Sequence, residues 1–165
     1  MEFFCYHRDR DGSTPLRAEM TEEHWSYMDR FDLVERGPTF DDETPSGSVH
    51  VVDLPDVAAA RDFVLDEPCY QAGAYRDVLL RRTAWTRPGG TATAGVLAIG
   101  FSEPTPYDGL AVPGDGLVGL GPLLSDDGAR LLGAAVLAAT EDEARTALAG
   151  FTAVEVHRWE RGGRR

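Results

Sequence analysis

The chain has 165 residues, with 28 acidic and 16 basic side chains and a formal net charge of −12. All 16 basic residues are arginine. This excludes Schiff-base lysine chemistry and the phosphate loop that ends in Gly-Lys-Ser/Thr. The acidic surplus argues against nucleic-acid binding, which depends on cationic contacts to phosphate, and no apolar run is long enough to span a bilayer. The two cysteines form neither a disulfide framework nor a CxxC pair, so we expect a reduced, cytoplasmic protein.

The first half of the sequence alternates between strand-like and helix-like patterns. An aromatic-rich start predicts a buried strand, and apolar residues at three-residue spacing from Trp25 to Val34 predict an amphipathic helix that Gly37-Pro38 ends. The expected elements are a strand over 2–8, a helix over 22–35, a strand over 47–53, a helix capped by Asp56 and stopped by Pro68, and a strand over 75–82.

The second half begins after a stretch of linker composition. Its pattern predicts a similar order of strands and helices with fewer elements. Its expected elements are a strand over 95–101, a Pro/Gly-rich loop over 102–116, a strand over 133–139, a helix over 141–149 and a strand over 151–159.

Four pairs of segments recur in the same order in the two halves, which indicates an internal repeat. The pairs are Gly37-Pro38 with Gly121-Pro122, each followed by two aspartates, Gly47-Ser48-Val49 with Gly133-Ala134-Ala135, Ala60-Arg61 with Ala144-Arg145, and 78–82 with 154–158. The second copy lacks the amphipathic helix and any counterpart of His24. We therefore expect one domain over 1–86, a linker over 87–94 and a degenerate repeat over 95–162.

The first half resembles the YciI-like, or YCII-related, domain family over roughly residues 1–85. The resemblance rests on Arg8-Asp9 after the first strand, His24 within TEEHWSYM, Gly-Pro followed by acidic residues, GSVHVVD, Asp66-Glu67-Pro68 and Ala72-Gly73. The family's usual Asp-Pro-Phe motif is altered, because Glu67 stands at the Asp position and Cys69 at the Phe position.

This resemblance implies an α+β fold with a ferredoxin-like sandwich in each half. Proteins of the superfamily commonly pair two such sheets into a dimeric α/β barrel, so a tandem copy would form an intramolecular pseudo-dimer. Such a chain could dimerise again or dock onto a pathway partner.

His24 is the main candidate for catalysis, because its unperturbed pKa suits acid–base work near neutrality and its position matches the family's His of a His/Asp site. Tyr27, one turn further along the predicted helix, is a candidate for substrate binding. The alternative is a partly buried structural histidine.

The carboxylate partner of His24 is open between Asp32 and two aspartates after the Gly-Pro turn, Asp41 and Asp42. Asp32 lies where the family's Asp falls, but eight positions along one helix are about 12 Å apart, so contact requires the helix to end early. Asp41 and Asp42 could reach back across the sheet. Each carboxylate could instead be a solvated turn residue.

Arg8 is the candidate for binding an anionic substrate, with a surface ion pair as its alternative. The four histidines and two cysteines lack HxH, HExxH or paired-cysteine spacing, so the sequence predicts no metal site and no cofactor.

These features favour a cofactor-independent enzyme that performs isomerase, lyase or cyclase chemistry on a small aromatic or polyketide-like metabolite. The alternative is a non-catalytic ligand-binding or accessory protein of a biosynthetic pathway. In that case the loop with Tyr107, Leu110 and Val112 would present an apolar groove.

Overall fold

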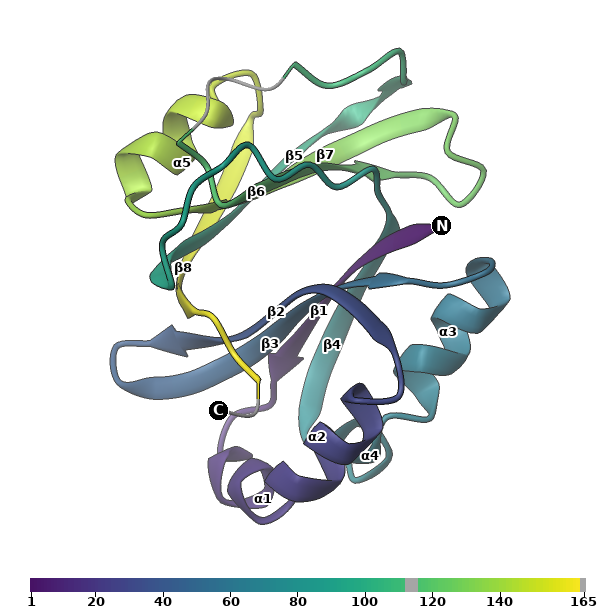
Figure 1. The fold of residues 1–165 in the computed structure, drawn as a ribbon, viewed down its shortest axis with the longest axis vertical. Helices are drawn as coiled ribbons and strands as arrows, with labels where there is room; N and C mark the ends of the chain where they lie inside the picture. The colour runs from purple at the N-terminus through teal and green to yellow at the C-terminus, as the bar shows by residue number, and fades with distance from the viewer. Residues whose placement is uncertain (112–115, 164–165) are drawn as a thin grey trace. The chain divides into compact units, whose positions relative to one another are not determined.

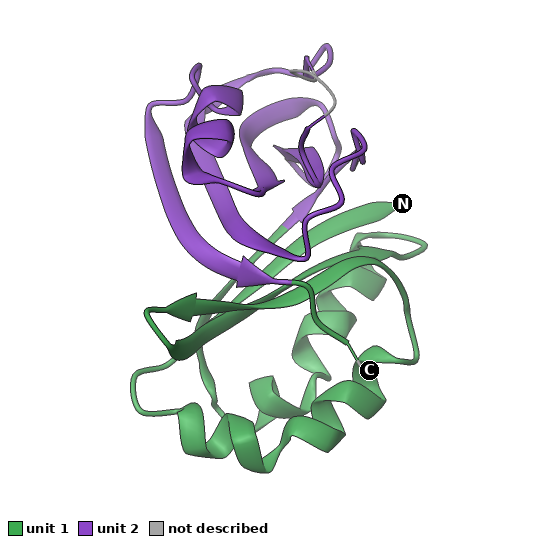
Figure 2. Cartoon of the chain, turned by 60° about the vertical axis from the view of Figure 1, so that its left-hand side comes forward, with its two compact units in different colours: residues 1–80, 161–165 green, residues 81–160 purple. Residues whose placement is uncertain are grey.

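The computed structural model describes residues 1–111 and 116–163, and the chain divides into two compact units. Unit 1 comprises Met1–Leu80 and Arg161–Arg165, and unit 2 comprises Arg81–Glu160 (Figure 2). None of the described helices is long and apolar enough to cross a membrane.

Unit 1 is a four-stranded sheet with helices on one face (Figure 1). The strands lie in the order β4-β1-β3-β2, and β3 is antiparallel to both β1 and β2, which is the ferredoxin-like arrangement. The elements are β1 (Glu2–Asp9), α1 (Thr14–Glu19), α2 (Thr21–Met28), β2 (Asp32–Asp41), β3 (Thr44–Asp53), α3 (Val57–Leu65), α4 (Pro68–Gln71) and β4 (Tyr75–Arg82).

The helix-covered face of this sheet is apolar at one end. Phe3 and Val52 from the sheet pack there against Met28 of α2 and Phe63 of α3, all nearly fully buried. The cap of α3 is the predicted one, since the Asp56 carboxylate accepts a hydrogen bond from the Ala59 N–H at 2.9 Å. This packing fixes α2 and α3 over the sheet.

The helix predicted over 22–35 is too long, and the prediction that Gly37-Pro38 ends it is wrong. Helix α2 stops at Met28, and the chain turns through Phe31 into β2. Gly37 and Pro38 lie inside β2, where they pair with Val49 and Ser48 of β3. The three-residue apolar spacing predicted too long a helix. The apolar residues of the last helical turn and of the alternating strand after it continue the same spacing.

Unit 2 repeats the sheet, and its described residues contain one helix. Its elements are β5 (Ala94–Pro106), β6 (Gly119–Leu124), β7 (Arg130–Ala138), α5 (Glu141–Ala147) and β8 (Ala153–Glu160). The strand order is β8-β5-β7-β6. Thr140 and Glu143 form a capping box at the start of α5. The α+β class and the tandem of ferredoxin-like repeats are thus confirmed.

The two units also match in strand register. In unit 1, Gly37 pairs with Val49, and in unit 2 Gly121 pairs with Ala135. The same register then places His7 of β1 opposite Ser48, and Gly100 of β5 opposite Ala134.

Between β5 and β6, the described residues form no helix in the place of α1 and α2. Leu110 and Leu117 from this region pack onto the unit 2 core, which also contains Val136 and Leu148. Val112, named above as part of a possible groove, lies outside the described residues.

Candidate active site

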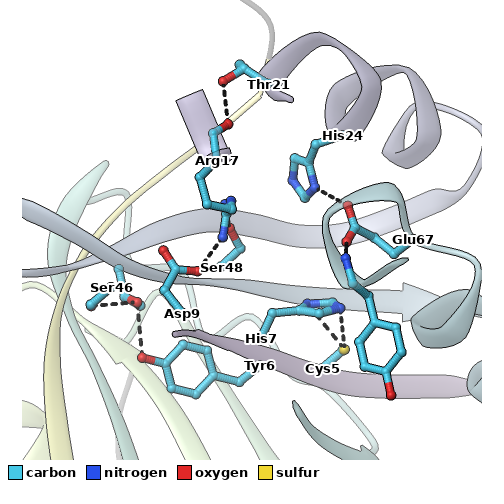
Figure 3. A network of polar contacts seen from close by, with 12 residues as sticks. Cys5, Tyr6, His7, Asp9, Arg17, Thr21, His24, Ser46, Ser48 and Glu67 are labelled. Atoms are coloured by element: carbon cyan, nitrogen blue, oxygen red, sulfur yellow. Dashed lines mark hydrogen bonds and ion pairs between the residues drawn. The ribbon is translucent and has the colours of Figure 1, made fainter. Parts of the chain in front are cut away.

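A histidine–carboxylate pair lies beneath the helices of unit 1. His24 on α2 contacts Glu67, the residue that caps α4, with 2.8 Å between His24 Nδ1 and Glu67 Oε1 (Figure 3). The second carboxylate oxygen of Glu67 accepts a hydrogen bond from the Tyr70 N–H at 2.7 Å. Glu67 is fully buried, whereas His24 keeps 8% of its surface exposed. The cap therefore fixes the carboxylate, and the carboxylate orients the imidazole.

The charge of Glu67 is stabilised where it lies. Burial works to raise its pKa, but the His24 hydrogen bond, the positive charge of a protonated His24 and the Tyr70 N–H outweigh burial and hold the pKa below its usual value. Glu67 is then ionised at neutral pH and can only accept, so His24 Nδ1 is the donor. In the neutral ring the lone pair is therefore on Nε2, which has no hydrogen-bond partner among the described residues.

Two further histidines project from the sheet towards His24. The His50 ring centroid lies 5.6 Å from that of His24 and 5.5 Å from that of His7. Burial lowers the pKa of His7 to about 3, although the negative charge of Glu67 opposes this, and burial also holds the pKa of His50 well below its usual value. Both rings are therefore neutral near pH 7.

A partly buried arginine supplies the positive charge of this region. Arg17 on α1 donates to the Asp9 carboxylate and, at 2.8 Å, to the Ser48 hydroxyl (Figure 3). Its guanidinium lies 5.0 Å from the centroid of the Tyr75 ring. Burial works to lower the pKa of Arg17, but Tyr75 and Asp9 outweigh it and raise the pKa. The guanidinium therefore stays charged.

The two cysteines of the chain are buried in the same unit. Burial, reinforced by the charge of Glu67, raises the pKa of Cys69 to about 11, and the same two causes raise that of Cys5. Both thiols are therefore protonated at neutral pH and are poor nucleophiles. The Cys69 Sγ, His24 nitrogen and Glu67 oxygen nonetheless all lie within 4.8 Å of one another.

Of the residues selected from the sequence, only His24 lies in this cluster. Asp32 is exposed at the first position of β2, and Asp42 is exposed in the turn between β2 and β3 with a φ of 52°. Arg8 forms an ion pair with Asp77 at 2.9 Å. Tyr27 donates to the Phe63 carbonyl at 3.1 Å, and burial raises its pKa to about 12.

Sequence reasoning missed Glu67 as the partner and Arg17 as the cation of the site. Glu67 is 43 positions from His24, so no local spacing connects them. One signal was available, because Glu67 stands at the Asp position of the family's post-helix motif. Arg17 carries no comparable signal, since it lies in a turn-rich segment with no motif around it.

Comparison with known proteins identifies the family of the chain. The chain belongs to the YCII-related domain family, whose model matches residues 1–84. The search of curated proteins finds no match. Among solved structures, the chain is similar to 5-chloro-2-hydroxyhydroquinone dehydrochlorinase from Burkholderia phenoliruptrix AC1100, in complex with 2,5-dihydroxybenzoquinone. The identity is 25%, the match covers 53% of this chain and 95% of that chain, and the TM-score is 0.48.

Proposed function

We propose that the chain is a cofactor-independent enzyme of isomerase, lyase or cyclase type that acts on a small aromatic or polyketide-like metabolite. His24 is the general acid/base and Glu67 is its positioning residue. The pair between His24 Nδ1 and the buried Glu67 carboxylate, 2.8 Å apart, carries this proposal. A carboxylate in this place holds one tautomer of the imidazole and stabilises the imidazolium that forms when the ring takes up a proton.

The chemistry requires one proton transfer in each direction. Nε2 of His24 removes a proton from an acidic carbon or hydroxyl of the substrate, and the imidazolium then returns it to another atom or to a leaving group. General acid–base catalysis of this kind contributes a rate factor of about 10²–10⁴. No nucleophilic step is assigned to the thiols, because both stay protonated.

Arg17 favours substrates that are acidic or become anionic during the reaction. Its guanidinium is partly buried and stays charged, with Asp9 and Ser48 as its hydrogen-bond partners. An enolate or phenolate forming nearby is stabilised by this fixed positive charge.

The alternative function, a non-catalytic ligand-binding protein, predicts a histidine whose ring nitrogens are held by backbone groups. His24 Nδ1 instead contacts a carboxylate. This difference favours the enzyme.

The test measures exchange of substrate carbon-bound hydrogen for deuterium. The protein is incubated in D2O with a panel of small phenols, hydroxyquinones and cyclic 1,3-diketones, and exchange is followed by proton NMR. We expect accelerated exchange for at least one compound and a loss of about 100-fold or more in His24→Gln. His157→Gln, which changes a partly exposed histidine of unit 2, is the matched control and should leave the rate unchanged. Full exchange activity in a folded His24→Gln variant would contradict the proposal.

A further inference from the structure

We propose that His24, Glu67 and Cys69 form a binding site for one divalent ion of the zinc class. The sequence predicted no metal site, because these three residues have no recognisable ligand spacing. The fold brings one nitrogen, one oxygen and one sulfur donor to within 4.8 Å of one another, and all three residues are buried. Imidazole, carboxylate and thiolate together form a donor set that zinc and cobalt accept.

The donor separations are close to those of an occupied site. Zinc bonds are about 2.0–2.2 Å to nitrogen and oxygen and about 2.3 Å to sulfur, so tetrahedral ligands lie roughly 3.3–3.6 Å apart. His24 Nδ1 and Glu67 Oε1 are 2.8 Å apart, and no pair of donors exceeds 4.8 Å. Side-chain movements of about 1 Å would therefore complete the three-ligand geometry, with a fourth position left for water or another ligand.

Two of the three ligands are held rigidly by the start of α4. Glu67 is the cap, Pro68 occupies the first helical turn and Cys69 follows it, so the carboxylate and the thiol project from one fixed turn. The Tyr70 N–H binds the second oxygen of Glu67 at 2.7 Å. Hydrogen bonds of this kind to a ligand carboxylate orient it and are part of natural metal sites.

Tyr75 lies next to the proposed thiol ligand. Its hydroxyl is buried, and Tyr75 and Cys69 lie close enough for each to affect the pKa of the other. A phenol hydroxyl beside a ligand thiolate can donate to it and stabilise its charge, as the outer partners of natural metal ligands do.

This inference does not depend on the proposed function. An ion on Nδ1 takes the place of the proton that His24 donates to Glu67, so the ion-bound state and the acid–base pair are alternative states of the same residues. The proposal therefore concerns binding, and its test needs no substrate.

The experiment titrates chelator-treated protein with Co²⁺ and records the absorption spectrum. We expect saturation at one ion per chain, visible bands of tetrahedral cobalt and a near-ultraviolet thiolate-to-cobalt charge-transfer band. Cys69→Ser should abolish the charge-transfer band, and His24→Gln should weaken binding by about tenfold or more. Cys5→Ala is the matched control, because it removes the other buried thiol, 3.7 Å from His7 Nδ1, and leaves all three proposed ligands in place.

Three results would overturn the proposal: no charge-transfer band in the unaltered protein, a band that survives Cys69→Ser, or a band lost in folded Cys5→Ala. Circular dichroism of each variant separates loss of a ligand from loss of the fold. X-ray absorption of the zinc-loaded unaltered protein decides the matter even where a variant does not fold. One sulfur with two or more nitrogen or oxygen neighbours supports the site, and an all-oxygen and nitrogen shell refutes it.

Discussion

The two units have the same sheet order and matching register, but the helix-covered faces of their sheets differ in chemistry. In unit 1 four neighbouring positions are polar or carry a thiol, and in unit 2 their counterparts are all small or apolar. The matched pairs are Cys5 with Ala98, His7 with Gly100, Ser48 with Ala134, and His50 with Val136. The helix-covered face thus carries a polar cluster in unit 1 and an apolar core in unit 2.

The difference follows from what covers each sheet. In unit 1, α1 and α2 bring Arg17 and His24 over the polar positions. The described residues of unit 2 contain no counterpart of those helices, and Phe151 takes up room at the position equivalent to His7. A Cβ built on Gly100 would lie 2.8 Å from Phe151. The small residues of unit 2 therefore leave room for Phe151 on the face that carries the polar cluster in unit 1.

The largest predicted effect concerns the carboxylate that pairs with His24. Glu67→Gln preserves shape but removes the charge and offers an NH₂ group to His24, so the imidazole loses its fixed tautomer. We expect the deuterium-exchange rate to fall by about 10²–10⁴. Asp32→Asn, the partner considered from sequence, should change it less than about twofold. Equal losses in both variants would show that the pair seen in unit 1 does not define the site.

A second prediction transfers a polar residue into unit 2. Val136 is fully buried in the unit 2 core, and Val136→His places an imidazole there without the surroundings that His50 has. We expect the free energy of unfolding to fall by about 2–4 kcal/mol, from overpacking and an unsatisfied polar group. Val136→Leu, of similar size but apolar, should cost about 1 kcal/mol. Urea denaturation measures the loss of unfolding free energy in both variants. Equal losses would mean that the difference in polarity between the two faces has no effect on stability.

The sequence predicted the repeat well and the site only in part. The repeated Gly-Pro and the segments at 47–49 and 133–135 are local features, and the structure places them at equivalent positions in β2, β6, β3 and β7. The partner of His24 depends on packing between α2 and the start of α4, which no spacing in the sequence encodes. His7 and His50 were seen only as strand residues, because alternation indicates burial but not which side chains meet.

A third prediction concerns acid stability. The pKa values of His7 and His50 are lowered in the folded state, so the unfolded chain binds protons more tightly once the pH falls below about 6.5. Folding stability is then full above pH 6.5 and falls by up to about 1.4 kcal/mol per pH unit for each ring. The lowered pKa of Glu67 reduces folding stability only when the pH falls below about 4.5. Urea unfolding between pH 7.5 and 5 measures this, and a flat profile below 6.5 would contradict it.

The smallest predicted effect comes from giving unit 1 the residue of unit 2 at one position. His50→Val removes a buried ring whose Nδ1 has no hydrogen-bond partner among the described residues, but it also loses the ring's contacts with Phe63 and His7. These two effects oppose each other, so we expect the free energy of unfolding at pH 7.5 to change by less than about 1 kcal/mol. The variant should nevertheless lose about half of the pH dependence between 6.5 and 5, because only His7 then remains to be charged on unfolding. A large stability loss at pH 7.5 with an unchanged slope would show that His50 serves packing alone. A near-neutral substitution with a reduced slope would show that the buried His50 ring lowers acid stability and adds little to stability at pH 7.5.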